Sequence, residues 1–165
     1  MAADPHAEIR ERWLRARPEL DFGPAELFGL VKHTQAMLDL LLEPVFEAAS
    51  LSSAEFDVLF QLRHAGEPTI ARRLALSMGR SPAALSKSLA KLEQRGMVRR
   101  EANPSDRRAA LVAITEAGEA AVDEIFPRRL TLEGEAVASL TPGERADVAA
   151  ALQLLSQAVE SHARR

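Results

Sequence analysis

The sequence predicts a mostly α-helical protein with one small β-hairpin, and three observations support this prediction. Alanine is plentiful and aromatic residues make up only 4% of the 165 residues, which favours helix. Apolar residues recur at three- and four-residue spacing in several stretches, which is the helical period. Two β-like runs, MVRRE and AALVAIT, flank the polar loop ANPSDRR. The length suits a single domain, residues 1–165, with a core of its own.

Two helices are expected in the N-terminal part of the chain. Residues 6–17 form the first, which ends at Pro18 and is followed by a short connection containing Gly23 and Pro24. The second is long, and Pro44 should kink or end it near its last turn. Its apolar residues share one stripe that must be buried against something, formed by Leu27, Leu30, Val31, Thr34, Leu38, Leu41, Leu42 and Val45.

A third helix is predicted from Ser52 to about Ala65. Ser52 and Glu55 have the spacing of a capping box, in which each side chain accepts a hydrogen bond from the other residue's backbone N–H. Gly66 can take the left-handed conformation that ends a helix. The amphipathic face consists of Phe56, Leu59 and Phe60.

The stretch TIARRLALSMGRSPAALSKSLAKLEQRG is interpreted as two short helices joined by a tight turn at residues 77–80. Gly79 is available for a left-handed conformation in that turn. Ser81 caps the second helix and Pro82 occupies its first position. One stripe of this helix is apolar, and the other side is small and basic: Leu85, Leu89 and Leu92 against Ala83, Ser86, Lys87, Ala90, Lys91 and Gln94.

Such a helix pair is typical of the helix-turn-helix, although bundles of short amphipathic helices share the pattern. The outward face has the chemistry to enter a DNA major groove. Ser86 and Lys87 can hydrogen-bond base edges, and Lys91 can reach a phosphate. An alanine methyl can meet the methyl group of a thymine. The predicted DNA-binding residues of this segment are Arg80, Ser81, Ala83, Ala84, Ser86, Lys87 and Lys91.

Charge is distributed unevenly along the chain, which has a net charge of −3. Residues 70–108 contain ten Lys or Arg and three acids, so the remainder of the chain is strongly acidic. A compact basic segment in an acidic body suits phosphate binding, because the other faces are repelled by DNA. A solvated basic face is the alternative interpretation.

The hairpin loop supplies a second recognition device beside the helix pair. Arg107 and Arg108 at its tip are expected to enter a minor groove, and Asp106 to hold one of these arginines by a charge-assisted hydrogen bond. Helix pair and hairpin together predict a winged helix-turn-helix lobe over residues 52–115 that binds double-stranded DNA.

With these motifs the sequence resembles the MarR family of bacterial transcription regulators. The resemblance rests on LALSMGRSPAALSKSLAKLEQRGMVRR, on NPSDRRAALVAITEAG and on the preceding LSSAEFDVLFQLRHAG. It implies a homodimer joined through residues 6–48 and 116–163, and a cytoplasmic, ligand-responsive regulator, expected to be a repressor. A last helix, capped by Thr141 and Glu144, offers a second apolar stripe for that interface, formed by Val148, Leu152, Leu155 and Val159. Burial of this helix within its own chain is the alternative.

Within the family, IRERWLRARPELDFGP and EFDVL resemble the urate-responsive PecS-like branch. That resemblance implies a ligand pocket containing Trp13 and Asp57, with Trp13 serving equally well as core packing. Where the branch has an arginine in the recognition helix, this sequence has Ser88, which lacks the charge and the reach to pair with an anionic ligand or with Asp57. We therefore expect an effector other than urate. Ser88 flanks the apolar stripe of its helix, so we expect it to face the interior and to be a third residue of the pocket.

Other function classes find little support in the sequence. It has no cysteine, and its four histidines lack ligand-like spacing, so no metal site or cofactor is expected. No serine or histidine lies in a nucleophile setting and no glycine-rich loop precedes a helix, which argues against an enzyme. No apolar run is long enough to span a membrane. A winged-helix adaptor that binds an acidic protein instead of DNA is the remaining alternative.

Overall fold

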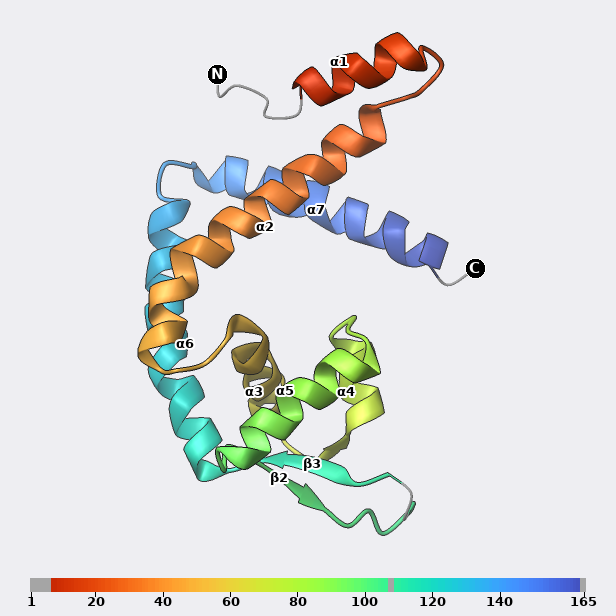
Figure 1. Cartoon of the computed structure of the whole chain (residues 1–165). Coiled ribbons are helices and arrows are strands. Elements are labelled where there is room, and N and C mark those ends of the chain that lie inside the picture. Colours follow the sequence, from red (N-terminus) through yellow and green to blue (C-terminus); the bar gives the residue numbers. More distant parts are fainter. Residues whose placement is uncertain (1–6, 107–108, 164–165) are drawn as a thin grey trace. The chain divides into compact units, whose positions relative to one another are not determined.

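The computed structural model describes residues 7–106 and 109–163. The chain divides into two compact units, residues 1–40 and 41–165. Helices predominate, and the three strands are short (Figure 1). In chain order the elements are α1 (Ala7–Ala16), α2 (Gly23–Ala48), α3 (Ser53–Ala65), β1 (Thr69–Ile70), α4 (Ala71–Ser77), α5 (Pro82–Gln94), β2 (Val98–Glu101), β3 (Leu111–Ile114), α6 (Glu116–Ala136) and α7 (Pro142–Ala163).

The first unit consists of α1 and most of α2. An ion pair between Arg10 and Glu26 links the two helices. Helix α2 continues past Pro44 to Ala48, so this proline does not end the helix as one expectation allowed. Pro44 lacks an N–H and so removes one helical hydrogen bond, and the helix continues for only four residues beyond it. Several apolar side chains of this unit remain exposed, among them Trp13, Leu27, Leu30 and Val31.

The core of the second unit is built from leucine, valine and phenylalanine side chains of helices α3 to α6 and strand β3. Phe56 and Leu59 of α3 are fully buried, as the amphipathic pattern predicted. The predicted capping box is present, with Ser52 and Glu55 bonded to each other's backbone N–H groups. Gly66 follows the helix with a φ of 71°, the left-handed conformation expected of it. The other most deeply buried side chains are Val58, Leu85, Leu89, Leu92, Val112 and Val122.

The sheet has three antiparallel strands in the order β1-β3-β2. The β2–β3 hairpin confirms the prediction, with Val98 opposite Ile114 and Glu101 opposite Leu111. The first residues of TIARRL were assigned to a helix in the sequence, and this assignment was wrong, because Thr69 and Ile70 pair with Val112 and Leu111. A two-residue strand leaves too little periodicity to be seen in the sequence.

Helix α6 approaches the hairpin closely at its first turn. Thr115 is the N-cap: its hydroxyl accepts a hydrogen bond from the Gly118 N–H at 3.3 Å and donates one to the Gly96 carbonyl at 2.7 Å. A Cβ atom on Gly118 would lie 2.3 Å from the Met97 carbonyl oxygen. Only glycine therefore fits where α6 leaves the sheet.

Helix α7 has the capping box expected of Thr141 and Glu144. None of its residues, Pro142–Ala163, is buried. Val148, Leu152 and Val159 of the predicted apolar stripe are each at least 44% exposed. The alternative in which α7 is buried within its own chain is therefore wrong, and its stripe faces outward.

Candidate nucleic-acid interface

Helices α4 and α5 form the predicted helix-turn-helix. Gly79 has a φ of 60°, the left-handed conformation that the tight turn requires. The Arg80 N–H then donates to the Ala75 carbonyl at 2.9 Å and closes the turn. Ser81 caps α5 by accepting a hydrogen bond from the Ala84 N–H at 3.2 Å, and Pro82 begins the helix.

Helix α5 has the two faces that its sequence predicted. Leu85, Leu89 and Leu92 are at most 1% exposed and pack into the core. The opposite face is exposed, and it combines short side chains with two lysines, so it can approach a DNA groove closely. This outward face consists of Ser81, Ala83, Ala84, Ser86, Lys87, Ala90 and Lys91.

The cations of the basic segment differ in what they contact. Several are held by acidic groups or carbonyl groups of the same unit. Within the described part of the chain, Arg72 and Arg73 on α4 and Lys87 on α5 have no ion pair or hydrogen bond from the side chain. The two arginines were counted in the basic segment but not singled out as DNA-binding residues. The held cations are Arg80, Lys91, Arg95, Arg99 and Arg100.

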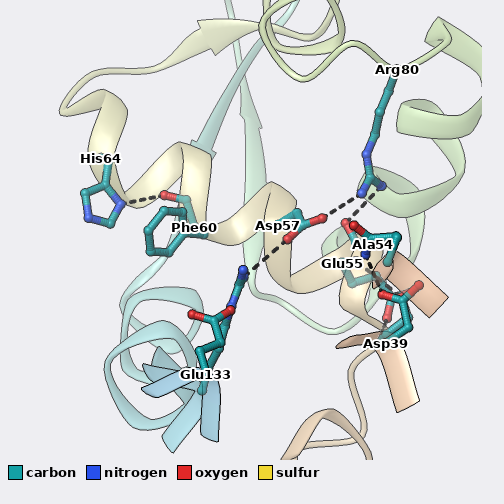
Figure 2. Close-up of polar contacts among 11 residues, drawn as sticks. Asp39, Ala54, Glu55, Asp57, Phe60, His64, Arg80 and Glu133 are labelled. Atoms are coloured by element: carbon teal, nitrogen blue, oxygen red, sulfur yellow. Dashed lines mark hydrogen bonds and ion pairs between the residues drawn. The ribbon is translucent and has the colours of Figure 1, made fainter. Parts of the chain in front are cut away.

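Both ends of α5 are fixed by arginines. Arg80, at the turn before the helix, pairs with the Asp57 carboxylate of α3 at 2.7 Å (Figure 2). Arg95, just after the helix, donates to the Ser50 carbonyl at 2.7 Å and to the Ala49 carbonyl at 3.2 Å. These two arginines therefore orient α5 on its scaffold, and charge counting along the sequence cannot separate that role from phosphate binding.

Lys91 pairs with Glu55, the buried acid of the α3 capping box, at 3.5 Å, while its side chain stays 58% exposed. Burial raises the pKa of Glu55, but hydrogen bonds from Ser52 and the positive charge of Lys91 outweigh burial and hold this pKa below its ordinary value. The ionised carboxylate is therefore the form that the fold stabilises.

Glu55→Gln is expected to lower the free energy of unfolding by about 1 kcal/mol at neutral pH, because it removes the charged partner of the cap. The folded-state pKa is depressed, so this contribution is present above the unfolded-state pKa and is lost as pH falls through the folded-state value. The difference in the free energy of unfolding between variant and wild type should therefore shrink in acid. Urea titrations from neutral pH down through the folded-state pKa measure this difference, with Glu67→Gln, in an exposed loop, as the control. A difference that does not change with pH would contradict the stabilising role of the ionised Glu55.

The hairpin loop between β2 and β3 is organised by Asn103. Its side-chain oxygen accepts hydrogen bonds from the Ser105 N–H at 2.9 Å and the Asp106 N–H at 3.3 Å, the arrangement of an Asx turn. Arg107 and Arg108, predicted to contact DNA, lie outside the described residues. The contact predicted between Asp106 and one of these arginines stays a prediction, because it involves the same two residues.

The residues proposed for a ligand pocket are distributed over both units. Trp13 is in the first unit and 53% exposed. In the second, Ser88 is buried on the inner side of α5, as its position in the helix predicted. Asp57 pairs with Arg80 and also with Arg129 of α6, at 3.7 Å. Arg129 was missed in the sequence, because nothing in residue spacing connects two helices so far apart along the chain.

Two shallow hollows of about 370 and 240 Å³ lie elsewhere in the second unit. Both include His64, and neither is lined by Asp57 or Ser88. Among the residues that the structure describes, no three His, Cys, Asp or Glu side chains are grouped to hold a metal ion. None of the helices in residues 7–106 and 109–163 combines the length and apolar character of a membrane span.

Fold and surface together define a winged helix-turn-helix DNA-binding protein. The MarR family model matches residues 51–110, the stretch from the capping box of α3 to the hairpin. Residues 51–110 therefore carry a MarR family domain, and the chain as a whole is similar to transcription regulators of that family. Members of this family are regulators and not enzymes, in agreement with the expectation from the sequence.

Three relatives show how far the similarity extends. The HTH-type transcriptional regulator PecS of Dickeya dadantii is 27% identical over 148 residues, covering 88% of this chain and 89% of PecS. A MarR mutant from E. coli complexed with operator DNA has a TM-score of 0.74 at 25% identity, covering 87% of this chain and 96% of that one. CouR from Rhodococcus jostii, bound to p-coumaroyl-CoA, has a TM-score of 0.68 at 25% identity, covering 76% and 88%.

Proposed function

We propose that this regulator is a homodimeric repressor that binds an operator of two half-sites through α5 and the hairpin. The observation that carries the proposal is the outward face of α5, where Lys87 lies among short exposed side chains and has no ion pair with any residue that the structure describes, while the opposite face packs into the core. The proposed contacts are Arg80, Ser81, Ala83, Ala84, Ser86, Lys87 and Lys91, with Arg107 and Arg108 of the hairpin. The similarity to MarR in complex with operator DNA supports them.

The dimer is proposed to form through residues 6–48 and 116–163, with residues 52–115 as the DNA-binding lobe. Exposed apolar stripes on α2 and α7 support this division, because such stripes are costly in water and a second copy offers matching surfaces. Two lobes related by a two-fold axis would read half-sites about 34 to 36 Å apart. Since DNA is the proposed partner, the protein is expected to act in the cytoplasm.

Ligand control is the second part of the proposal. A small molecule bound near Asp57, Ser88 and Trp13 would favour another separation of the lobes and weaken DNA binding. The complex of CouR with p-coumaroyl-CoA supports regulation by a small molecule in this fold. Ser88 carries no charge, so the effector is proposed to differ from urate.

The test is a fluorescence titration of the purified protein with the intergenic DNA beside its own gene and with scrambled DNA, at two salt concentrations. Tight binding that prefers the intergenic DNA and falls steeply with salt is expected, because six or more phosphate contacts release as many counterions. Absence of binding to both DNAs would overturn the proposal in favour of the protein-binding adaptor. The same assay with added candidate ligands tests the control step.

A further inference from the structure

Four side chains of alternating charge connect α6 with the turn of the helix-turn-helix. Arg80 at the turn pairs with Asp57 of α3 at 2.7 Å, and Asp57 pairs with Arg129 of α6 at 3.7 Å. Arg129 in turn donates from Nε to Glu133 at 2.6 Å. Figure 2 shows that Asp57 lies between Arg80 on one side and α6, marked by Glu133, on the other. The order of charges is therefore positive, negative, positive, negative across three elements.

Arg129 is held more firmly than a surface arginine. Its guanidinium carbon lies 5.7 Å from the centre of the Phe56 ring, and that phenylalanine is completely buried. Its side chain is only 27% exposed, and Glu133, one turn later, fixes its other edge. Helix α6 is itself anchored in the core by Val122 and Ile125. A planar guanidinium fixed on several sides loses little further entropy when it orients a carboxylate.

The other end of this series lies directly beside the recognition helix. Arg80 immediately precedes Ser81, the N-cap of α5, and a second nitrogen of Arg80 lies 3.4 Å from the Ala54 carbonyl. The side chain of Arg80 therefore determines where the turn and the first residues of α5 lie on α3. These first residues include Ala83 and Ala84 of the proposed DNA-binding face.

We propose that Arg129 is a positioning residue for the recognition helix α5. Arg129 orients Asp57, and Asp57 in turn holds Arg80 at the start of this helix. A displacement of α6 moves the Arg129 guanidinium, changes the orientation of Asp57 and thereby loosens the turn at residues 77–81. The guanidinium that Ser88 cannot supply to Asp57 from α5 is supplied from α6 instead. This inference rests on the proposed DNA-binding face, so its test includes a measurement made without DNA.

The first experiment compares hydrogen exchange of backbone amides in the free protein for Arg129→Ala, Arg129→Lys and wild type. Arg129→Ala should speed exchange at residues 77–81 at least threefold and leave the β3 amides unchanged. Arg129→Lys should restore part of the protection, because it keeps the charge but cannot bridge Asp57 and Glu133 as a fork. Arg128→Ala is the control, since Arg128 is the neighbouring arginine and, among the described residues, its one ion pair is with Glu124 on its own helix.

The second experiment is a double-mutant cycle on DNA affinity with Arg80→Ala and Arg129→Ala. Multiplying the wild-type Kd by the fold-increases of the two single variants gives the Kd expected if the residues act independently. If both act through Asp57, the Kd of the double variant should be at least threefold lower than this expected value. Multiplicative effects together with unchanged exchange at residues 77–81 would overturn the proposal. If no variant or wild type binds DNA, the proposed function fails, while the exchange data still decide the role of Arg129. Should Arg129→Ala unfold, Arg129→Lys supplies the same comparison.

Discussion

Gly118→Ala is expected to lower the free energy of unfolding by about 3 kcal/mol, because the new methyl group would clash with neighbouring atoms. It would lie 2.3 Å from the Met97 carbonyl oxygen and 2.7 Å from a side-chain carbon of Ile114. The first of these atoms is backbone, so α6 must shift away from the hairpin. That shift would also pull on the Thr115 cap, whose hydroxyl joins α6 to Gly96.

The matched control is Gly134→Ala in the same helix, where a Cβ atom meets nothing within 4 Å. There the substitution should raise the free energy of unfolding by about 0.5 to 1 kcal/mol, because alanine loses less backbone entropy than glycine in a helix. Urea unfolding followed by circular dichroism, at equal protein concentrations, measures both. Equal stability of the two variants would show that the approach at Gly118 is not tight in solution.

Lys87→Ala is expected to weaken operator binding by about 1 to 3 kcal/mol, or about 5- to 150-fold in Kd, if the lysine contacts a base edge. The side chain is exposed on α5 and has no ion pair within the described residues, so it is free to leave water for DNA. The loss should be concentrated at one base pair of each half-site. Titrations with operators altered one position at a time identify that pair.

Lys32→Ala on α2 is the control for the loss of a positive charge outside the basic segment of residues 70–108. It should reduce affinity far less and leave the preference among operators unchanged. Because Lys87 is exposed and its side chain has no ion pair or hydrogen bond to residues 7–106 or 109–163, its variant should unfold at the wild-type temperature. Equal effects of the two substitutions would remove Lys87 from the recognition surface.

The local features of the DNA-binding lobe could be predicted from the sequence because each depends on neighbouring residues. The capping box of Ser52 and Glu55 requires only a spacing of three, and the turn at Gly79 only a residue that tolerates positive φ. The burial of Ser88 also followed from its angle on the helix. The strand β1 was missed because its two residues form a strand only through their pairing with β3.

The basic segment shows where sequence reasoning reaches its limit. Ten cations within 39 residues predicted a DNA-binding surface, and the match of residues 51–110 to the MarR family model agrees with it. Their individual roles depend on acids and carbonyl groups that the fold brings near, so Arg80 and Arg95 orient α5, while Lys87 has no ionic partner in the part of the chain that the structure describes. A composition count assigns the same role to all of them.

Hydrophobic period and capping chemistry act over a few residues, so the helices, their caps, the hairpin and the two faces of α5 can be predicted from the sequence. Which charges meet depends instead on how the elements pack. Asp57, Arg80 and Arg129 come from three separate elements, and their pairing requires the packing of α3 between α5 and α6. Electrostatic partners are chosen by distance in space, and in this protein that distance is set by the buried leucines, valines and phenylalanines of the core.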